Sequence, residues 1–196
     1  MNDNYLASVK KQFLYYKQLG DKTFAQLNDD ALIWQFNEDS NSIAMIVSHI
    51  SGNMRSRFTD FLDTDGEKAW RIRDEEFEPQ ETSREELLIK WEKGWECLFN
   101  AVNALTSADL ERTIYIRNEG HTVVEAINRQ LAHYPYHIGQ IVMLGKMLAK
   151  DGWQSLSIPR GQSQNYNNEK FAQPKQNKHF TDDVLNNSTA NQSSES

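Results

Sequence analysis

The chain has 196 residues, of which 38% are hydrophobic and 25% charged, with a net charge of −7. These values suit one globular domain with a core of ordinary size. The negative charge argues against nucleic acid or an anionic membrane as a partner, and no segment has the roughly 20 apolar residues that a membrane helix needs.

Two features predict a cytoplasmic protein. The single cysteine, Cys97, allows no internal disulfide, which suits a reducing compartment. The segment from Met1 to Lys11 lacks the apolar run of a signal peptide. Cys97 follows two tryptophans at helical spacing, so we interpret it as a small packed residue and not as a catalytic thiol.

The first predicted helix runs from Tyr5 to Leu27, with a point of kinking or fraying at Gly20 and Asp21. Its apolar side chains recur at spacings of three and four, which places them on one face: Leu6, Val9, Phe13, Tyr16, Leu19 and Phe24. Residues 31–36 are short and apolar, and they predict either a helical turn or an extended connector.

The second predicted helix begins after an N-cap at Asn41 or Ser42 and keeps its apolar spacing to Leu62. Residues 63–66 end it. Residues 67–80 are charged and predict a long ordered loop with three isolated apolar anchors, which are Trp70, Ile72 and Phe77.

Two further helices carry N-terminal signals. Ser83 with Glu86, and Thr122 with Glu125, have the spacing of a capping box. Between these helices, residues 113–117 alternate and predict a strand, and residues 118–120 predict a turn. The last helix is expected to end at residues 150–152.

Four long amphipathic helices predict an all-α protein, a four-helix bundle with a short β-hairpin before the last long helix. We assign residues 1–171 to this domain, with scattered apolar residues from Trp153 onward holding the chain to it. Residues 172–196 are rich in Asn, Gln, Ser and Lys, and predict a polar tail that is disordered or loosely attached.

His133 and His137 lie four residues apart in the last predicted helix, so both rings share one face and can chelate one ion. His49 lies in the apolar middle of the second predicted helix, and a bundle can bring it opposite that pair. Three histidines would leave a coordination position open, as catalytic sites do. Spacing alone leaves an alternative, in which the pair arises by chance and His49 is a hydrogen-bonded core residue.

Several segments resemble the DinB/YfiT-like superfamily. The run from Leu131 to Ile141, LAHYPYHIGQI, is similar to its last-helix motif, and the run from Ser48 to Asn53 is similar to its second-helix motif. Residues 53–62 and 153–161 resemble the DUF1572 branch. The resemblance implies a four-helix bundle, a metal-binding triad of His49, His133 and His137, and a homodimer.

The same resemblance implies thiol chemistry, because members of the superfamily include thiol-dependent S-transferases and a mycothiol-dependent isomerase. Zinc is the expected ion, with nickel, iron or manganese as alternatives. A low-molecular-weight thiol is the expected co-substrate. Since metal-bound histidines usually donate their second N–H to an acceptor, we single out three nearby amides, which are Asn53, Gln130 and Gln140.

Three side chains are candidate substrate contacts. Tyr136 lies beside His137, and Arg57 and Arg129 could bind the carboxylates of a thiol cofactor. Packing for the tyrosine, and ion pairs with acidic residues for the arginines, are the alternatives.

Three functions are compatible with these features. The leading hypothesis is a divalent-metal-dependent enzyme, an S-transferase or a hydrolase, acting on a small molecule. The second is a non-catalytic metal-binding stress or sensor protein. The third is a dimeric interaction module whose histidines have no function.

Overall fold

The structure, a computed structural model, describes residues 2–79 and 82–185. It is mostly helical. The long helices are α1 (Asn2–Phe24), α3 (Ile43–Phe58), α4 (Arg84–Ala104) and α5 (Val123–Ala149). The shorter elements are α2 (Asp29–Ile33), η1 (Asp74–Phe77), η2 (Ser107–Asp109), β1 (Thr113–Ile116), β2 (Glu119–Thr122), η3 (Lys150–Gly152) and α6 (Ser163–Phe171).

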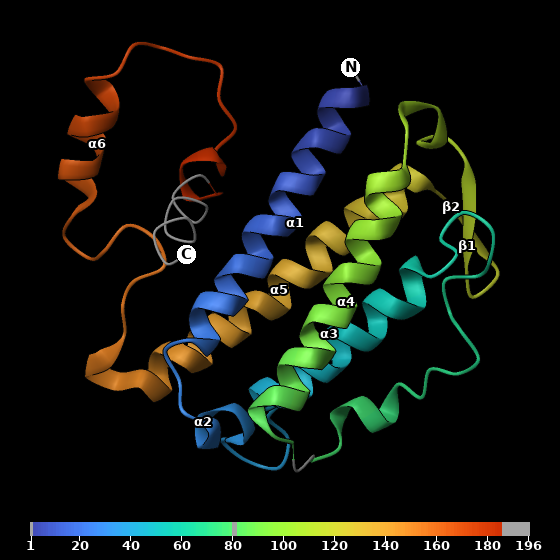
Figure 1. The fold of residues 1–196 in the computed structure, drawn as a ribbon, viewed down its shortest axis with the longest axis horizontal. Coiled ribbons are helices and arrows are strands. Elements are labelled where there is room, and N and C mark those ends of the chain that lie inside the picture. Colours follow the sequence, from blue (N-terminus) through green and yellow to red (C-terminus); the bar gives the residue numbers. More distant parts are fainter. Residues whose placement is uncertain (1, 80–81, 186–196) are drawn as a thin grey trace, which may run out of the picture.

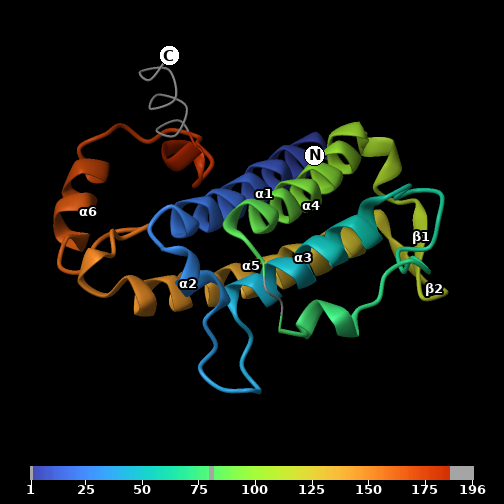
Figure 2. The ribbon, with the colours of Figure 1, turned by 60° about the horizontal axis from the view of Figure 1, so that its bottom comes forward.

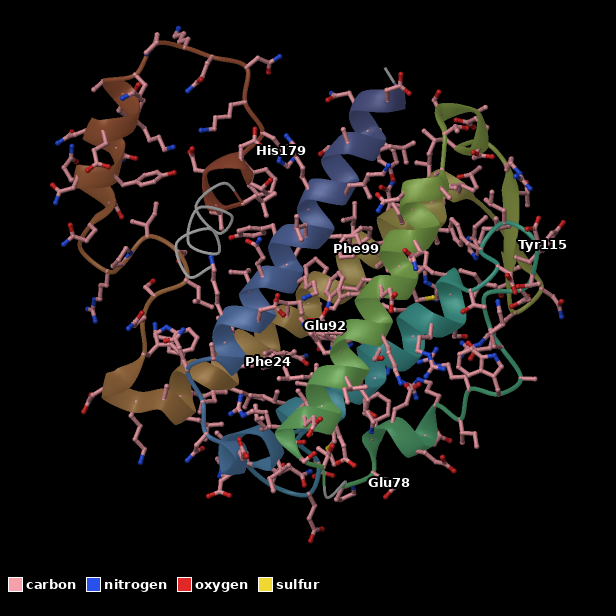
Figure 3. The ribbon with its side chains drawn as sticks, viewed as in Figure 1. Phe24, Glu78, Glu92, Phe99, Tyr115 and His179 are labelled. Atoms are coloured by element: carbon pink, nitrogen blue, oxygen red, sulfur yellow. The ribbon has the colours of Figure 1, made fainter. Side chains whose placement is uncertain are left out.

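The four long helices lie in two layers (Figures 1 and 2). Helices α1 and α4 form one layer and α3 and α5 the other. The closest pairings are between the layers, α3 with α4 and α1 with α5. One continuous apolar core lies between them. Its largest fully buried side chains include Trp91, Trp95, Tyr134 and Phe13. Figure 3 shows Phe24 among the packed helices and Glu78 at the periphery.

The predicted caps are confirmed. Ser83 accepts a hydrogen bond from the Glu86 amide, and the Glu86 carboxylate accepts one from the Ser83 amide. Thr122 and Glu125 form the same capping box at the start of α5. These exchanges satisfy amides that have no partner inside the helix, which is why α4 and α5 start where the sequence predicts.

Helix α1 passes through Gly20 without a break, and ends at Phe24. A Cβ at Gly20 would lie 2.5 Å from the Trp91 ring, so the glycine serves close packing of α1 on α4. The indole nitrogen of Trp91 also donates to Asp21 at 2.6 Å. The residues expected to fray α1 therefore attach it to α4.

The hairpin turn begins one residue earlier than predicted and ends two residues earlier. Arg117 and Asn118 form it with φ of 56° and 62°, and Glu119 begins β2. Two successive residues in the left-handed region are what a tight turn between right-twisted strands requires. The carboxylate of Asp65 accepts hydrogen bonds from both amides, at 2.9 and 2.8 Å, and stabilises this conformation.

The chain beyond α5 leaves the four long helices. Helix α6 stands apart from them, and each of its residues is exposed (Figure 1). The tail then returns to α1, where His179 contacts Ser8 at 3.0 Å and Lys11 pairs with Asp182 at 2.7 Å (Figure 3). Residues 186–196 of the expected disordered tail lie outside the described residues.

Within the described ranges, none of the helices combines the length and apolar character needed to cross a membrane.

Candidate metal centre

Three histidines meet where α3 and α5 face each other. His49 comes from the middle of α3, and His133 and His137 come from successive turns of α5. His49 and His137 are buried, while His133 is half-exposed. The cluster therefore lies below the surface but is accessible through one of its members.

The ring nitrogens converge on one point. One nitrogen from each ring lies within 4.8 Å of the others. The Nε2 atom of His133 is 3.3 Å from that of His49 and 3.2 Å from that of His137. Ligands about 2.0–2.1 Å from a tetrahedral zinc ion lie roughly 3.3–3.4 Å apart, so the two separations that involve His133 are close to those of a shared ion.

Each ring has an oxygen acceptor on its opposite nitrogen. Nδ1 of His49 is 2.9 Å from Glu76, Nδ1 of His133 is 3.3 Å from the amide oxygen of Gln130, and Nδ1 of His137 is 3.1 Å from that of Gln140. An amide or carboxylate oxygen can only accept, so each Nδ1 carries the proton. In a neutral ring of this tautomer the lone pair lies on Nε2.

Lone pairs on nitrogens 3.2 and 3.3 Å apart repel one another unless a cation lies between them. A proton is a poor candidate. Burial, reinforced by nearby positive charge, lowers the pKa of His133 to about 3, and burial also lowers the pKa of His137. The donor set therefore fits a divalent ion held by neutral imidazoles.

Glu76 is the acceptor that the sequence analysis missed. It lies in η1, and the Arg71 guanidinium binds both of its oxygens at 2.8 Å. Burial raises the pKa of Glu76, but Arg71 and His49 outweigh that effect and lower it below its ordinary value. The carboxyl group is thus held ionised beside the His49 ring.

Space for this carboxylate comes from Gly52, one turn after His49. A Cβ at Gly52 would lie 2.1 Å from a Glu76 oxygen. Phe77, the next residue of η1, packs its ring against His49 with centroids 4.7 Å apart. The segment expected to be a loop with apolar anchors therefore covers His49 from the side away from α5.

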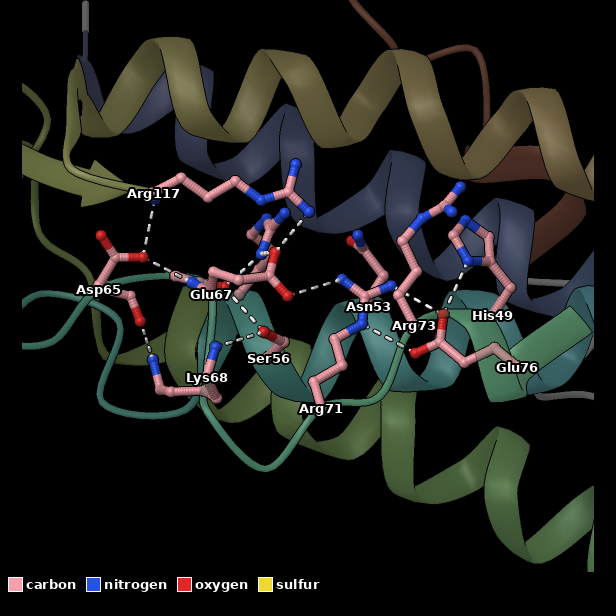
Figure 4. A network of polar contacts seen from close by, with 12 residues as sticks. His49, Asn53, Ser56, Asp65, Glu67, Lys68, Arg71, Arg73, Glu76 and Arg117 are labelled. Atoms are coloured by element: carbon pink, nitrogen blue, oxygen red, sulfur yellow. Dashed lines mark hydrogen bonds and ion pairs between the residues drawn. The ribbon is translucent and has the colours of Figure 1, made fainter.

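A chain of charges connects this segment to the hairpin (Figure 4). Glu67 binds Arg57 and Arg117, each at 3.0 Å, and lies 3.8 Å from Arg71. Arg71 in turn holds Glu76. A continuous series of polar contacts therefore runs from His49 to the hairpin turn.

Two of the residues singled out from the sequence are placed away from the histidine nitrogens. The Asn53 amide oxygen accepts a hydrogen bond from the buried Tyr134 hydroxyl at 2.9 Å. The Arg57 guanidinium is buried and donates to the Gly66 carbonyl and to Glu67. Asn53 thus connects α3 to α5, and Arg57 connects α3 to the segment that follows it.

Two others lie beside the cluster. Tyr136 is 65% exposed, and its ring centroid lies 5.1 Å from that of His137. Arg129 is exposed one turn before His133, and its charge contributes to the lowered pKa of that histidine. Pro135 separates the two α5 histidines without ending the helix.

Comparison with known proteins identifies the family. No curated protein matches the chain. The family described as "Protein of unknown function (DUF1572)" matches residues 1–162, which include all four long helices and the histidine cluster. The chain therefore belongs to the DUF1572 family.

Proposed function

We propose that this protein is a divalent-metal-dependent enzyme, a transferase or hydrolase that acts on a small molecule. We also propose that its four long helices form a bundle of the DinB/YfiT-like type. The observation that supports the enzyme proposal is the convergence of three histidine rings, each with an oxygen acceptor at its Nδ1 atom. Zinc is the preferred ion, because three imidazoles at these separations suit it.

The proposed chemistry needs an open coordination position. Three protein ligands would leave one position of a tetrahedral ion free, and we propose that small molecules reach it beside the half-exposed His133. A divalent ion bound there would act as a Lewis acid and lower the pKa of a water or thiol that it binds.

The chain's own residues would prepare this position. Gln130 and Gln140 fix the two α5 rings, and Glu76 fixes the α3 ring with the help of Arg71. Tyr136 and Arg129 lie at the exposed side of the cluster, where we propose that they contact the substrate. A low-molecular-weight thiol remains the proposed co-substrate, and the lone cysteine suits a cytoplasmic location.

Activity and stability can be separated with one substitution. Zinc-loaded wild type should transfer a thiol to electrophiles, or hydrolyse an ester or amide, in a screened panel. His137→Ala should lose this turnover while keeping its helical circular-dichroism spectrum. His121→Ala, which changes a half-buried histidine of β2, is the matched control and should keep the turnover.

The alternative is a metal centre without catalysis. It would appear as a large loss of thermal stability on chelation, no turnover with any member of the panel, and unfolding of His137→Ala. That combination would reject the enzyme proposal.

A further inference from the structure

A small pocket lies between α3 and α5, in the same layer of the molecule as the histidine cluster (Figure 2). It has a volume of about 220 Å³ and is lined by Asn41, Ile46, Gln140, Met143 and Leu144. Asn41 precedes α3, Ile46 lies in its first turn, and the other three residues come from the C-terminal half of α5. The pocket therefore lies along the line of contact between the two helices that carry the histidines.

The pocket and the histidine cluster share one side chain. Gln140 lines the pocket, and its amide oxygen is 3.1 Å from Nδ1 of His137. Ile46 lies three residues before His49, just as Gln140 lies three residues after His137. Three residues correspond to about 4.5 Å of helix rise, so a molecule bound at the histidines has the pocket within reach.

The walls of the pocket are mostly apolar and carry no charge. Ile46 is 1% exposed, Leu144 is half-buried, and Met143 is 65% exposed and so forms the outer wall. Asn41 and Gln140 contribute neutral amides. A charged group bound there would lose water without gaining a charged partner, whereas an apolar group is stabilised by leaving water.

The two amides of the pocket have donors to offer. The Gln140 oxygen faces His137, so its amino group is left for another acceptor. Within the part of the chain that the structure describes, neither this amino group nor the Asn41 side chain forms a hydrogen bond. A carbonyl oxygen at the start of an apolar chain can therefore pair with them.

The volume limits the size of the group that the pocket can hold. A water-sized group takes roughly 30 Å³ in a liquid, so 220 Å³ holds about seven carbon atoms. Sites for whole drug-sized ligands are larger, about 300–1,000 Å³. The pocket thus suits one part of a substrate whose remainder lies outside it.

We infer that this pocket binds an uncharged alkyl group of the substrate while the reacting part of the substrate lies at the three histidines. The inference rests on the proposed function, and it narrows the substrate to compounds that carry such a group. Ile46, Met143 and Leu144 then determine specificity, because they select the alkyl group by its size and its lack of charge.

Straight-chain hydroxamic acids, from acetohydroxamic to decanohydroxamic acid, test this inference. The hydroxamate group chelates zinc, and the alkyl chain extends from it. Calorimetric titration of the zinc-loaded wild type should give a dissociation constant that falls about fourfold per methylene once the chain reaches the pocket, and then levels off when the pocket is full. A carboxylate in place of the terminal methyl group should remove most of this gain.

A pair of matched variants assigns the gain to the pocket. Met143→Glu puts a charge on the outer wall and should reduce the gain to less than about twofold per methylene. Its side chain is exposed and glutamate suits a helix, so the fold should be unaffected. Met147→Glu, one turn further along α5 at a side chain that is 51% exposed, is the control and should bind the series like wild type.

Two results of these titrations would overturn the inference. One is a dissociation constant for wild type that does not change with chain length. The other is a Met143→Glu protein that binds the series as wild type does.

The metal-free protein separates this inference from the proposed function. Hexanamide, which is neutral, should shift the methyl NMR signals of Ile46, Met143 and Leu144, but not those of Leu14 and Ile72, which are exposed elsewhere. These shifts in a protein that binds no zinc would refute the metal centre and leave the pocket standing. Zinc binding without these shifts would do the reverse.

Discussion

At the scale of single residues, the histidines of the cluster differ in the hydrogen-bond acceptor at their Nδ1 atom. Gln130 and Gln140 offer neutral amide oxygens to His133 and His137, whereas Glu76 offers a charged carboxylate to His49. A carboxylate partner makes an imidazole a stronger donor to a cation. We therefore expect His49 to anchor the ion, with the two α5 rings completing the set.

Substitution of Glu76 tests this asymmetry. Glu76→Ala removes the acceptor and should weaken zinc binding roughly 10–100-fold. Glu76→Gln keeps an acceptor without its charge and should fall between this variant and wild type. Competition with a chromogenic zinc chelator measures both. Glu78→Gln, an exposed neighbour, is the control, and equal affinities for all four proteins would show that Glu76 does not tune the site.

Gly52→Ala should also weaken zinc binding, by displacing Glu76 instead of removing it. The added methyl group would overlap the Glu76 carboxylate and push it away from His49. We expect zinc affinity to fall by at least about 10-fold while the apolar core stays intact. An unchanged affinity, measured with the same chelator, would mean that η1 shifts without consequence for the ion.

Acid should destabilise the metal-free protein. The pKa values of His133, about 3, and of His137 are lowered on folding, so below the ordinary histidine value of about 6.5 the unfolded chain binds more protons. Stability should therefore be full above pH 6.5 and fall as the pH drops from there towards 3. Urea unfolding across this range measures it. In a His133→Ala/His137→Ala variant, stability should depend less on pH. If it depends on pH as in wild type, these two histidines are not the cause.

At the scale of elements, the sequence predicts helices well where a cap and an apolar period coincide. Ser83 and Thr122 mark the starts of α4 and α5 correctly, and the apolar spacing gives their buried faces. The hairpin turn was misplaced because Asn118 and Gly120 are both turn residues, and only Asp65, distant in sequence, selects Arg117 and Asn118. Helix α6 was not predicted, because it buries no face and so has no apolar period.

Only part of the candidate site could be predicted from the sequence. Spacing identifies His133 and His137 as a pair, because one helix fixes their geometry. His49 joins them only through the packing of α3 on α5, which the family resemblance implied. Glu76 lies 27 residues after His49 in a segment with no periodic pattern, so only the structure places it at the ring.

The N-cap of α5 sets the start of the helix that carries two of the three histidines. Thr122→Ala removes one side of its capping box and should lower the free energy of unfolding by about 1 kcal/mol. Since the histidines lie three turns further on, zinc affinity should be unchanged. Urea unfolding and chelator competition measure the two quantities, and a large loss of affinity would show that the helix end is coupled to the site.

At the scale of the whole molecule, the cluster joins parts of the chain that are far apart in sequence. Helix α3, the η1 segment and α5 each contribute to it, and Glu67 extends the connection to the hairpin. An ion bound only by the folded chain should stabilise the whole domain. At a free zinc concentration about 1,000 times the dissociation constant, the gain would be about 4.1 kcal/mol.

The most direct test of the central claim is the metal content of the protein. Elemental analysis after zinc reconstitution and extensive dialysis should give one divalent ion per chain for wild type. X-ray absorption should show three imidazole nitrogens around it. A variant with His49, His133 and His137 all changed to alanine should retain none. A wild type without stoichiometric metal, or a triple variant that binds as much as wild type, would contradict the account.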